Sequence, residues 1–231
     1  MARPPGAGGR RRPGCGSAGV SERWLAAHAD SPSLASPTAS RAAWLTGQSS
    51  PTQQRLSPAQ ERFLDGLAPH GWTPLRAGFP WTERAAAGTY GGEPLFAASV
   101  RNTRQGLAAR PGSALARDVA RHLQPLLDTT RDRLLLLCAS AGARLVTSAV
   151  DAVEVPEGLR IDVVGIGAVG ALPPTHGPWH VHVLRGRSDL LSAVSHRRRA
   201  DAVVPGGHLR AAASPAMLAA VLDLVGGGTS A

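Results

Sequence analysis

The feature that most constrains the fold of this chain is an apolar run that ends at a serine among small residues. Four leucines at 134–137 lead into Cys138-Ala139-Ser140-Ala141-Gly142, and a helical pattern follows over 143–153. A buried strand, a sharp turn and then a helix force the apex serine into a strained backbone conformation, which requires small neighbours two positions away. Cys138 and Gly142 meet that requirement. The alternative interpretation of Ser140 is an unreactive helix N-cap.

Strands and helices are predicted to alternate over the rest of the C-terminal half. Residues 161–166 form a β-branched apolar run, and residues 179–184 alternate between apolar and polar. A short strand at 200–204 and an amphipathic helix at 214–225 complete the chain. This alternation predicts an α/β fold with a mostly parallel sheet and helices on both faces.

Three polar residues each follow one of these predicted strands. They are Ser140, Asp189 and His208. Because functional residues gather at the carboxyl ends of the strands in such sheets, one sheet edge is expected to bring the three together.

The chain order serine, aspartate, histidine resembles the α/β-hydrolase superfamily. The resemblance covers about residues 70–226 and is strongest from 134 onward. The short spacings leave no room for a large cap domain, so the nearest comparison is a small, lidless serine esterase. The resemblance implies a serine hydrolase that cleaves an ester or related acyl bond, and an acyl thioesterase would share the same residues.

The resemblance also implies a role for each residue. Ser140 would attack the acyl carbonyl, His208 would accept the serine proton, and Asp189 would orient the histidine. The backbone N–H of Ala141 would donate a hydrogen bond to the oxyanion.

Each of these assignments has a competitor in the sequence. Asp189 also fits a helix N-cap, and His208 also fits an ordinary loop histidine. Asp162 and Asp201 are rival acids, but the first is expected inside a strand and the second at the start of one.

The N-terminal half departs from the hydrolase pattern. Residues 21–52 predict short helical pieces, and no apolar strand is expected before residue 57. In the family, the loop after such a strand supplies the second oxyanion donor. We therefore expect an N-terminally reduced sheet, and the alternative function is a non-catalytic or decayed protein of the same fold.

Local signals predict three further elements. Ser57, Pro58 and Gln60 indicate a capped helix start. A strand at 72–76 is expected to lie at a sheet edge or to be broken because it contains Pro74, and a helix is expected at 114–127. Residues 78–81 predict a turn that could border the active site.

Composition sets the outer limits. The 231 residues predict one domain at 21–226 after a disordered tail at 1–20 that is rich in Gly, Pro and Arg. The net charge is +9, and all 25 basic residues are arginine. Clusters at 10–12 and 197–199 lack the aromatic side chains of a nucleic-acid groove, so no nucleic-acid partner is expected. No stretch is long enough for a membrane span, and the expected location is cytoplasmic, with a small-molecule acyl substrate as partner.

Two further patterns in the sequence are incomplete as binding sites, so no metal and no cofactor are expected. His176, His180 and His182 could hold zinc, but no neighbouring carboxylate or cysteine completes a site. Gly165, Gly167 and Gly170 have dinucleotide-motif spacing, but the prolines that follow cannot open the required helix.

Overall fold

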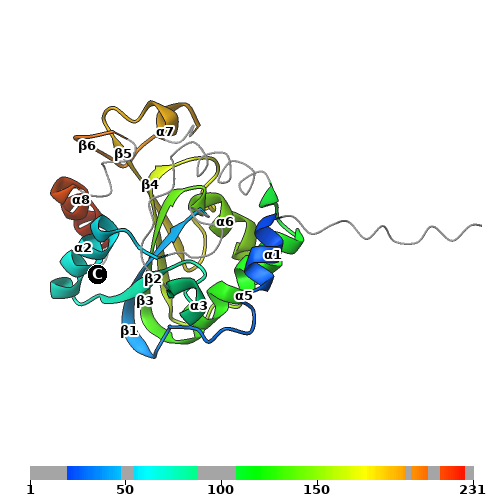
Figure 1. Cartoon of the computed structure of the whole chain (residues 1–231). Coiled ribbons are helices and arrows are strands. Elements are labelled where there is room, and N and C mark those ends of the chain that lie inside the picture. Colours follow the sequence, from blue (N-terminus) through cyan, green and yellow to red (C-terminus); the bar gives the residue numbers. More distant parts are fainter. Residues whose placement is uncertain (1–19, 48–54, 88–107, 196–198, 208–213, 227–231) are drawn as a thin grey trace, which may run out of the picture.

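The computed structural model describes residues 20–47, 55–87, 108–195, 199–207 and 214–226 (Figure 1). Its elements in chain order are α1 (Val20–Ala26), β1 (Thr38–Thr46), α2 (Pro58–Leu67), η1 (Ala68–His70), β2 (Thr73–Gly78), α3 (Glu83–Ala86), α5 (Ala114–Asp128), β3 (Thr130–Ser140), α6 (Gly142–Ala149), η2 (Val150–Ala152), β4 (Arg160–Ala168), β5 (Trp179–Gly186), α7 (Leu190–Ser195), β6 (Ala202–Val204) and α8 (Pro215–Gly226).

The six strands form one parallel sheet in the order β2-β1-β3-β4-β5-β6. The chain passes from β1 outward to β2 and then returns to the other side of β1 to form β3. The strand order therefore reverses between β1 and β3. Sheets of this type bind ligands in the crevice outside the carboxyl ends of the strands at such a reversal. Ser140, the last residue of β3, lies at this point.

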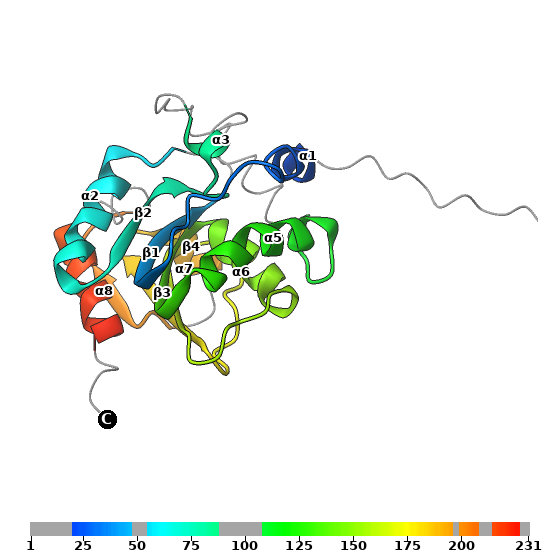
Figure 2. The ribbon, with the colours of Figure 1, turned by 90° about the horizontal axis from the view of Figure 1, so that it is seen from below.

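Helices cover both faces of the sheet (Figure 2). Helices α1, α5 and α6 lie on one face, and α2 and α8 lie on the other. The leucines of β3 alternate between the two cores: Leu134 and Leu136 face the first, and Leu135 and Leu137 face the second. All four are fully buried because the strand is covered on both sides. The predicted α/β class, with a parallel sheet and helices on both faces, is confirmed.

Strand β1 corrects our interpretation of residues 21–52, where we expected helical pieces and no strand. β1 lies inside the sheet between β2 and β3. Its sequence, Thr-Ala-Ser-Arg-Ala-Ala-Trp-Leu-Thr, is poor in β-branched residues and places Arg41 at a position that is only 1% exposed. Neutral oxygens accept from this guanidinium: Nε donates to Thr130 Oγ1 at 2.9 Å, and Nη2 donates to the carbonyls of Ser36 and Thr129. Arg41 interrupts the apolar pattern in the middle of the strand, and for this reason the sequence did not predict β1.

Other local predictions are confirmed. Helix α2 begins with a reciprocal capping box, in which Ser57 Oγ accepts from Gln60 N at 3.3 Å and Gln60 Oε1 accepts from Ser57 N at 2.9 Å. β2 is an edge strand and contains Pro74. α5 runs to Asp128 with Pro125 in its last turn.

The expected tail at 1–20 falls outside the described residues except for its last residue. Within the described ranges, no helix is both long enough and apolar enough to cross a membrane.

Candidate active site

Ser140 occupies the turn between β3 and α6. Its φ angle is 51°, in the left-handed region that non-glycine residues rarely adopt. β3 ends at Ser140 and α6 begins at Gly142, so a single residue separates the strand from the helix. The Ser140 side chain is half-buried. A strained serine between a buried parallel strand and a helix has the geometry of a nucleophile elbow.

The small residues around Ser140 are required by packing. A Cβ atom added to Gly142 would lie 1.9 Å from the carbonyl oxygen of Leu45, far inside van der Waals contact. Cys138 is fully buried, and burial raises the pKa of its thiol well above the usual range. The thiol is therefore protonated and does not compete with Ser140 as a nucleophile.

The contact between Gly142 and Leu45 joins the elbow to the end of β1. Leu45 is followed by Thr46, the last residue of β1, and by the buried Gly47. The backbone that leaves β1 therefore lies against the first turn of α6. We expected no strand before residue 57, and β1 shows that this expectation was wrong.

The backbone N–H of Ala141 is available for a hydrogen bond. The Ala141 carbonyl accepts from Arg144 N at 3.1 Å and from Leu145 N at 3.3 Å, as expected for the residue before a helix. Its N–H has no acceptor in the part of the chain that the structure describes. A buried N–H at the positive end of a helix, next to a serine, can donate to negative charge that develops on a bound carbonyl oxygen.

Asp189 follows β5 and is 2% exposed. Its Oδ1 accepts from Ser192 N at 2.9 Å, and its own N–H donates to Gly186 O at 3.0 Å. The N-cap interpretation of Asp189 is therefore confirmed. Capping uses one of the two carboxylate oxygens of Asp189.

The segments after β5 and β6 are held together at the same edge of the sheet. Ser188 N donates to Gly206 O at 3.0 Å, and Arg187 N donates to Val204 O at 2.8 Å. A Cβ atom added to Gly186 would lie 2.5 Å from Gly206 O, so the two backbones approach as closely as glycine allows. Residues 206–207 thus lie beside the loop that carries Asp189. His208, the next residue in the sequence, lies outside the described residues.

The rival acids occupy other positions. Asp162 is the third residue of β4 and therefore lies inside a strand, as the sequence predicted. Asp201 immediately precedes β6, and its carboxylate accepts from Val183 N at 2.7 Å. Neither follows the carboxyl end of a strand, which is where Asp189 lies.

Asp162 belongs to a small charged cluster on β4 and β5. Its fully buried carboxylate accepts from Arg160 Nη2 at 2.9 Å and lies 3.4 Å from His182 Nε2. Burial raises the pKa of Asp162, but the hydrogen bonds from His182 and Arg160 outweigh burial, so the pKa lies below its ordinary value. His182 thus contacts a carboxylate. The described residues contain no group of three or more His, Cys, Asp or Glu side chains placed to hold a metal ion.

Trp81, which the sequence places in a turn, is a further residue that shapes the region after β2. Trp81 is fully buried with a φ of 58°, and its Nε1 donates to Trp44 O at 3.0 Å. The Phe79 ring packs edge-on against it with ring centroids 5.0 Å apart. The turn after β2 is thereby fixed to β1 close to its carboxyl end. The sequence signal for this packing role was the presence of two large aromatic residues, Phe79 and Trp81, directly after a predicted strand.

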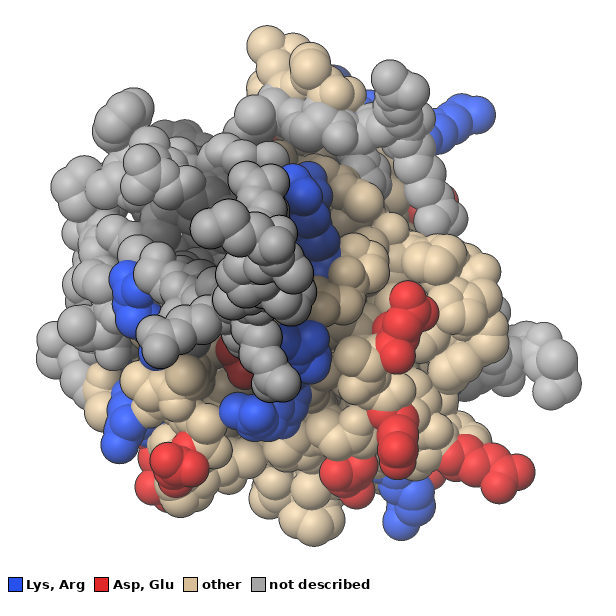
Figure 3. Space-filling model, turned by 90° about the vertical axis from the view of Figure 1, so that its right-hand side faces the viewer, with Lys and Arg blue, Asp and Glu red and all other residues tan. Residues whose placement is uncertain are grey.

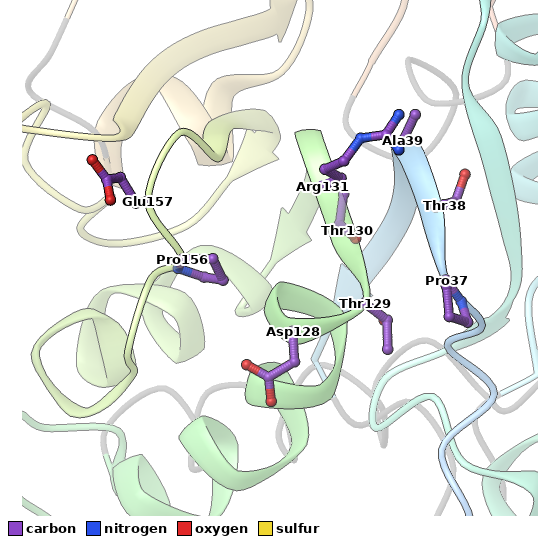
Figure 4. Close-up of a pocket in the computed structure, with 9 residues that line it drawn as sticks. All are labelled: Pro37, Thr38, Ala39, Asp128, Thr129, Thr130, Arg131, Pro156 and Glu157. Atoms are coloured by element: carbon purple, nitrogen blue, oxygen red, sulfur yellow. The ribbon is translucent and has the colours of Figure 1, made fainter.

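A separate hollow of about 470 Å³ opens at the other end of the sheet (Figure 4). It lies roughly 30 Å from Ser140, since β3 rises about 3.3 Å per residue from Thr130 to Ser140. None of its lining residues is a serine, cysteine or histidine. The lining residues are Pro37, Thr38, Ala39, Asp128, Thr129, Thr130, Arg131, Pro156 and Glu157.

Comparison with known proteins yields similarity at the level of structure. No protein-family model matches the sequence, and no curated protein matches it. A dienelactone hydrolase from Anabaena variabilis is similar with a TM-score of 0.47 and 17% identity, over 82% of this chain and 86% of that chain. A proposed hydrolase from Agrobacterium vitis is similar with a TM-score of 0.44 and 14% identity, over 85% of this chain and 90% of that chain.

Proposed function

We propose that the protein is a serine hydrolase that cleaves an ester or related acyl bond through Ser140, Asp189 and His208. The observation that carries this proposal is the left-handed backbone of Ser140 at the end of β3, next to the N–H of Ala141, which has no acceptor among the described residues. A strained serine is retained where the strain serves a purpose, and here it would present the hydroxyl outside the sheet edge.

The spacing of the strands supports the pairing of Ser140 with Asp189. The two residues follow β3 and β5, which are separated only by β4, so they are about 10 Å apart along the sheet edge. A histidine ring between them would span that gap. The segment that leads to His208 approaches Asp189 through the contact between Gly206 and Ser188.

The chemistry would then proceed in two steps. The ring of His208 accepts the Ser140 proton as Oγ attacks the acyl carbonyl, and it returns the proton to the leaving group as the acyl-enzyme forms. Water attacks the acyl-enzyme by the same route and releases the acid. Asp189 holds the tautomer of the ring and stabilises its protonated form.

The developing oxyanion needs two donors. Ala141 N–H is the first. We propose that the second comes from the backbone that follows β1, because Leu45 contacts the elbow at Gly142. Loss of one donor of this kind costs about a hundred- to a thousandfold in turnover. The alternative of a non-catalytic protein was motivated by the lack of this strand and of the oxyanion loop that follows it, and β1 supplies the strand.

The test is labelling by a fluorophosphonate probe, which reacts with activated serines. We expect labelling of the wild type and none of Ser140→Ala, with labelling retained by Ser148→Ala, a buried serine of α6. Asp189→Asn and His208→Ala should each lower turnover of a p-nitrophenyl ester by roughly a thousandfold or more. An unlabelled but folded wild type would refute the proposal.

A further inference from the structure

Two arginines lie beside the candidate active site without any use in the proposed mechanism. Arg144 is the third residue of α6, four positions after Ser140. Its side chain packs against the loop after β4, since a Cβ atom added to Gly170 would lie 2.6 Å from Arg144 Cδ. That loop is attached to the elbow, because Val169 N donates to Ser140 O at 3.2 Å. The Arg144 side chain therefore extends from α6 toward the loop at the carboxyl end of β4.

Arg185 is the next-to-last residue of β5 and is half-buried. Side chains alternate along a strand, so Arg185 shares a face with Trp179 and Val181. Both of those residues belong to the core that is packed against α6. Arg144, on the helix that follows β3, and Arg185, on β5, thus lie on the same face of the sheet near its carboxyl edge, and β4 lies between β3 and β5.

Both guanidinium groups are without an ion pair or a hydrogen bond to any residue that the structure describes. The nearby carboxylates are engaged elsewhere: Asp189 caps α7, and Asp201 accepts from a backbone N–H of β5. On the molecular face that carries α5 and α6, acidic side chains lie at the right, the lower right and the lower left, and several arginines lie over the centre (Figure 3). Two half-buried guanidinium groups without an ion-pair partner among the described residues attract an anion to this edge of the sheet. The planar guanidinium group, with its parallel N–H donors, suits a carboxylate.

We propose that Arg144 and Arg185 bind a carboxylate carried by the substrate, so that the protein selects anionic over neutral esters. The inference rests on the proposed hydrolase function and adds the chemical class of the substrate. The anion would lie across β4 from the elbow, which places the charged end of the substrate on the β5 side of the scissile carbonyl. Merely solvated arginines would not discriminate between substrates, so kinetics can separate the two interpretations.

The experiment compares two p-nitrophenyl esters with acyl chains of equal length, the hexanoate and the adipate monoester. We expect wild type to have the higher kcat/KM for the adipate ester. Arg144→Gln and Arg185→Gln should each lower the ratio of the adipate to the hexanoate kcat/KM by about tenfold or more, as for the loss of a charged hydrogen bond. The matched control is Arg131→Gln, which removes the same charge at the opposite edge of the sheet, where Arg131 is exposed and paired with Asp132.

The outcomes separate this inference from the proposed function. If both esters are hydrolysed and the preference is the same in all variants, the inference is refuted and the hydrolase stands. An equal effect of Arg131→Gln would also refute it, since that result reflects net charge. If neither ester is hydrolysed and Ser140 is not labelled by the fluorophosphonate, both proposals fail. Arg144→Lys, which keeps the charge without the parallel N–H donors of the guanidinium group, should restore part of the preference.

Discussion

The strained backbone of Ser140 predicts that glycine is more stabilising than alanine at this position, which is the reverse of the usual order. Glycine normally destabilises a protein relative to alanine, because glycine loses more backbone freedom on folding. At Ser140 the φ of 51° should reverse that order. Ser140→Ala and Ser140→Gly both remove the hydroxyl, so they differ only in the Cβ atom. We expect Ser140→Gly to be the more stable of the two.

The magnitude follows from two opposing terms. A left-handed conformation costs a residue with a Cβ atom about 1–2 kcal/mol, and glycine escapes this cost. The greater entropy loss of glycine offsets about 0.5–1 kcal/mol of that gain. The net difference in free energy of unfolding is therefore about 0.5–1 kcal/mol in favour of Ser140→Gly. For a chain of this size, that corresponds to a Tm difference of roughly 2 °C.

The assay is urea denaturation of both variants, with Tm measured by calorimetry. The matched control is Ser148, which lies within α6 in ordinary helical conformation. There, Ser148→Gly should be less stable than Ser148→Ala by about 1 kcal/mol. If Ser140→Gly is less stable than Ser140→Ala by a similar amount, the backbone at Ser140 is relaxed and the structural argument for a nucleophile elbow fails.

Three further perturbations have definite expected outcomes. Gly142→Ala should cost about 1–3 kcal/mol or more and abolish fluorophosphonate labelling, because its Cβ atom would meet Leu45 O at 1.9 Å. The free energy of unfolding should fall as the pH drops below about 6.5, since both His28 and His122 have pKa values lowered by burial. Asp162→Asn should cost about 1–3 kcal/mol at neutral pH and remove part of the acid sensitivity, because two basic partners lose a charged acceptor.

The sign of the histidine effect follows from linkage. Desolvation lowers the pKa of His28, and the charges of His122 and Arg84 lower it further. The unfolded chain therefore binds protons at a higher pH than the folded chain, and stability is lost as the pH falls through 6.5. The double variant His28→Asn, His122→Leu should flatten this region of the stability profile. An unchanged profile would show that neither histidine is held neutral in the folded protein.

The two other perturbations have equally simple controls. Gly226→Ala adds a Cβ atom that meets nothing within 4 Å, so it should leave stability and labelling intact. For Asp162, the folded pKa is below the ordinary value of 3.8, so its contribution is complete above that pH and is lost at more acidic pH. If the wild type and Asp162→Asn lose stability equally between pH 5 and 2, the charged cluster does not contribute.

The sequence predicted the elbow because its signals are local. Four leucines identify a buried strand, and the small residues around Ser140 identify a sharp turn. The need for glycine at Gly142 could not be derived in this way. It arises from Leu45, which is distant in the sequence and reaches Gly142 only through the pairing of β1 with β3. Contacts of this kind depend on the sheet order, which no local pattern reveals.

Arg41 explains why the missed strand matters for the site. Its guanidinium connects β1 to Thr129 and Thr130, where α5 ends and β3 begins. A one-residue slip of β1 along β3 would break these hydrogen bonds and exchange the side chains that β1 directs into the two cores. The same slip would carry the Leu45 carbonyl away from Gly142 and open the elbow. The residue that disguised β1 in the sequence is therefore one that fixes its register, and that register supports the strained backbone at Ser140.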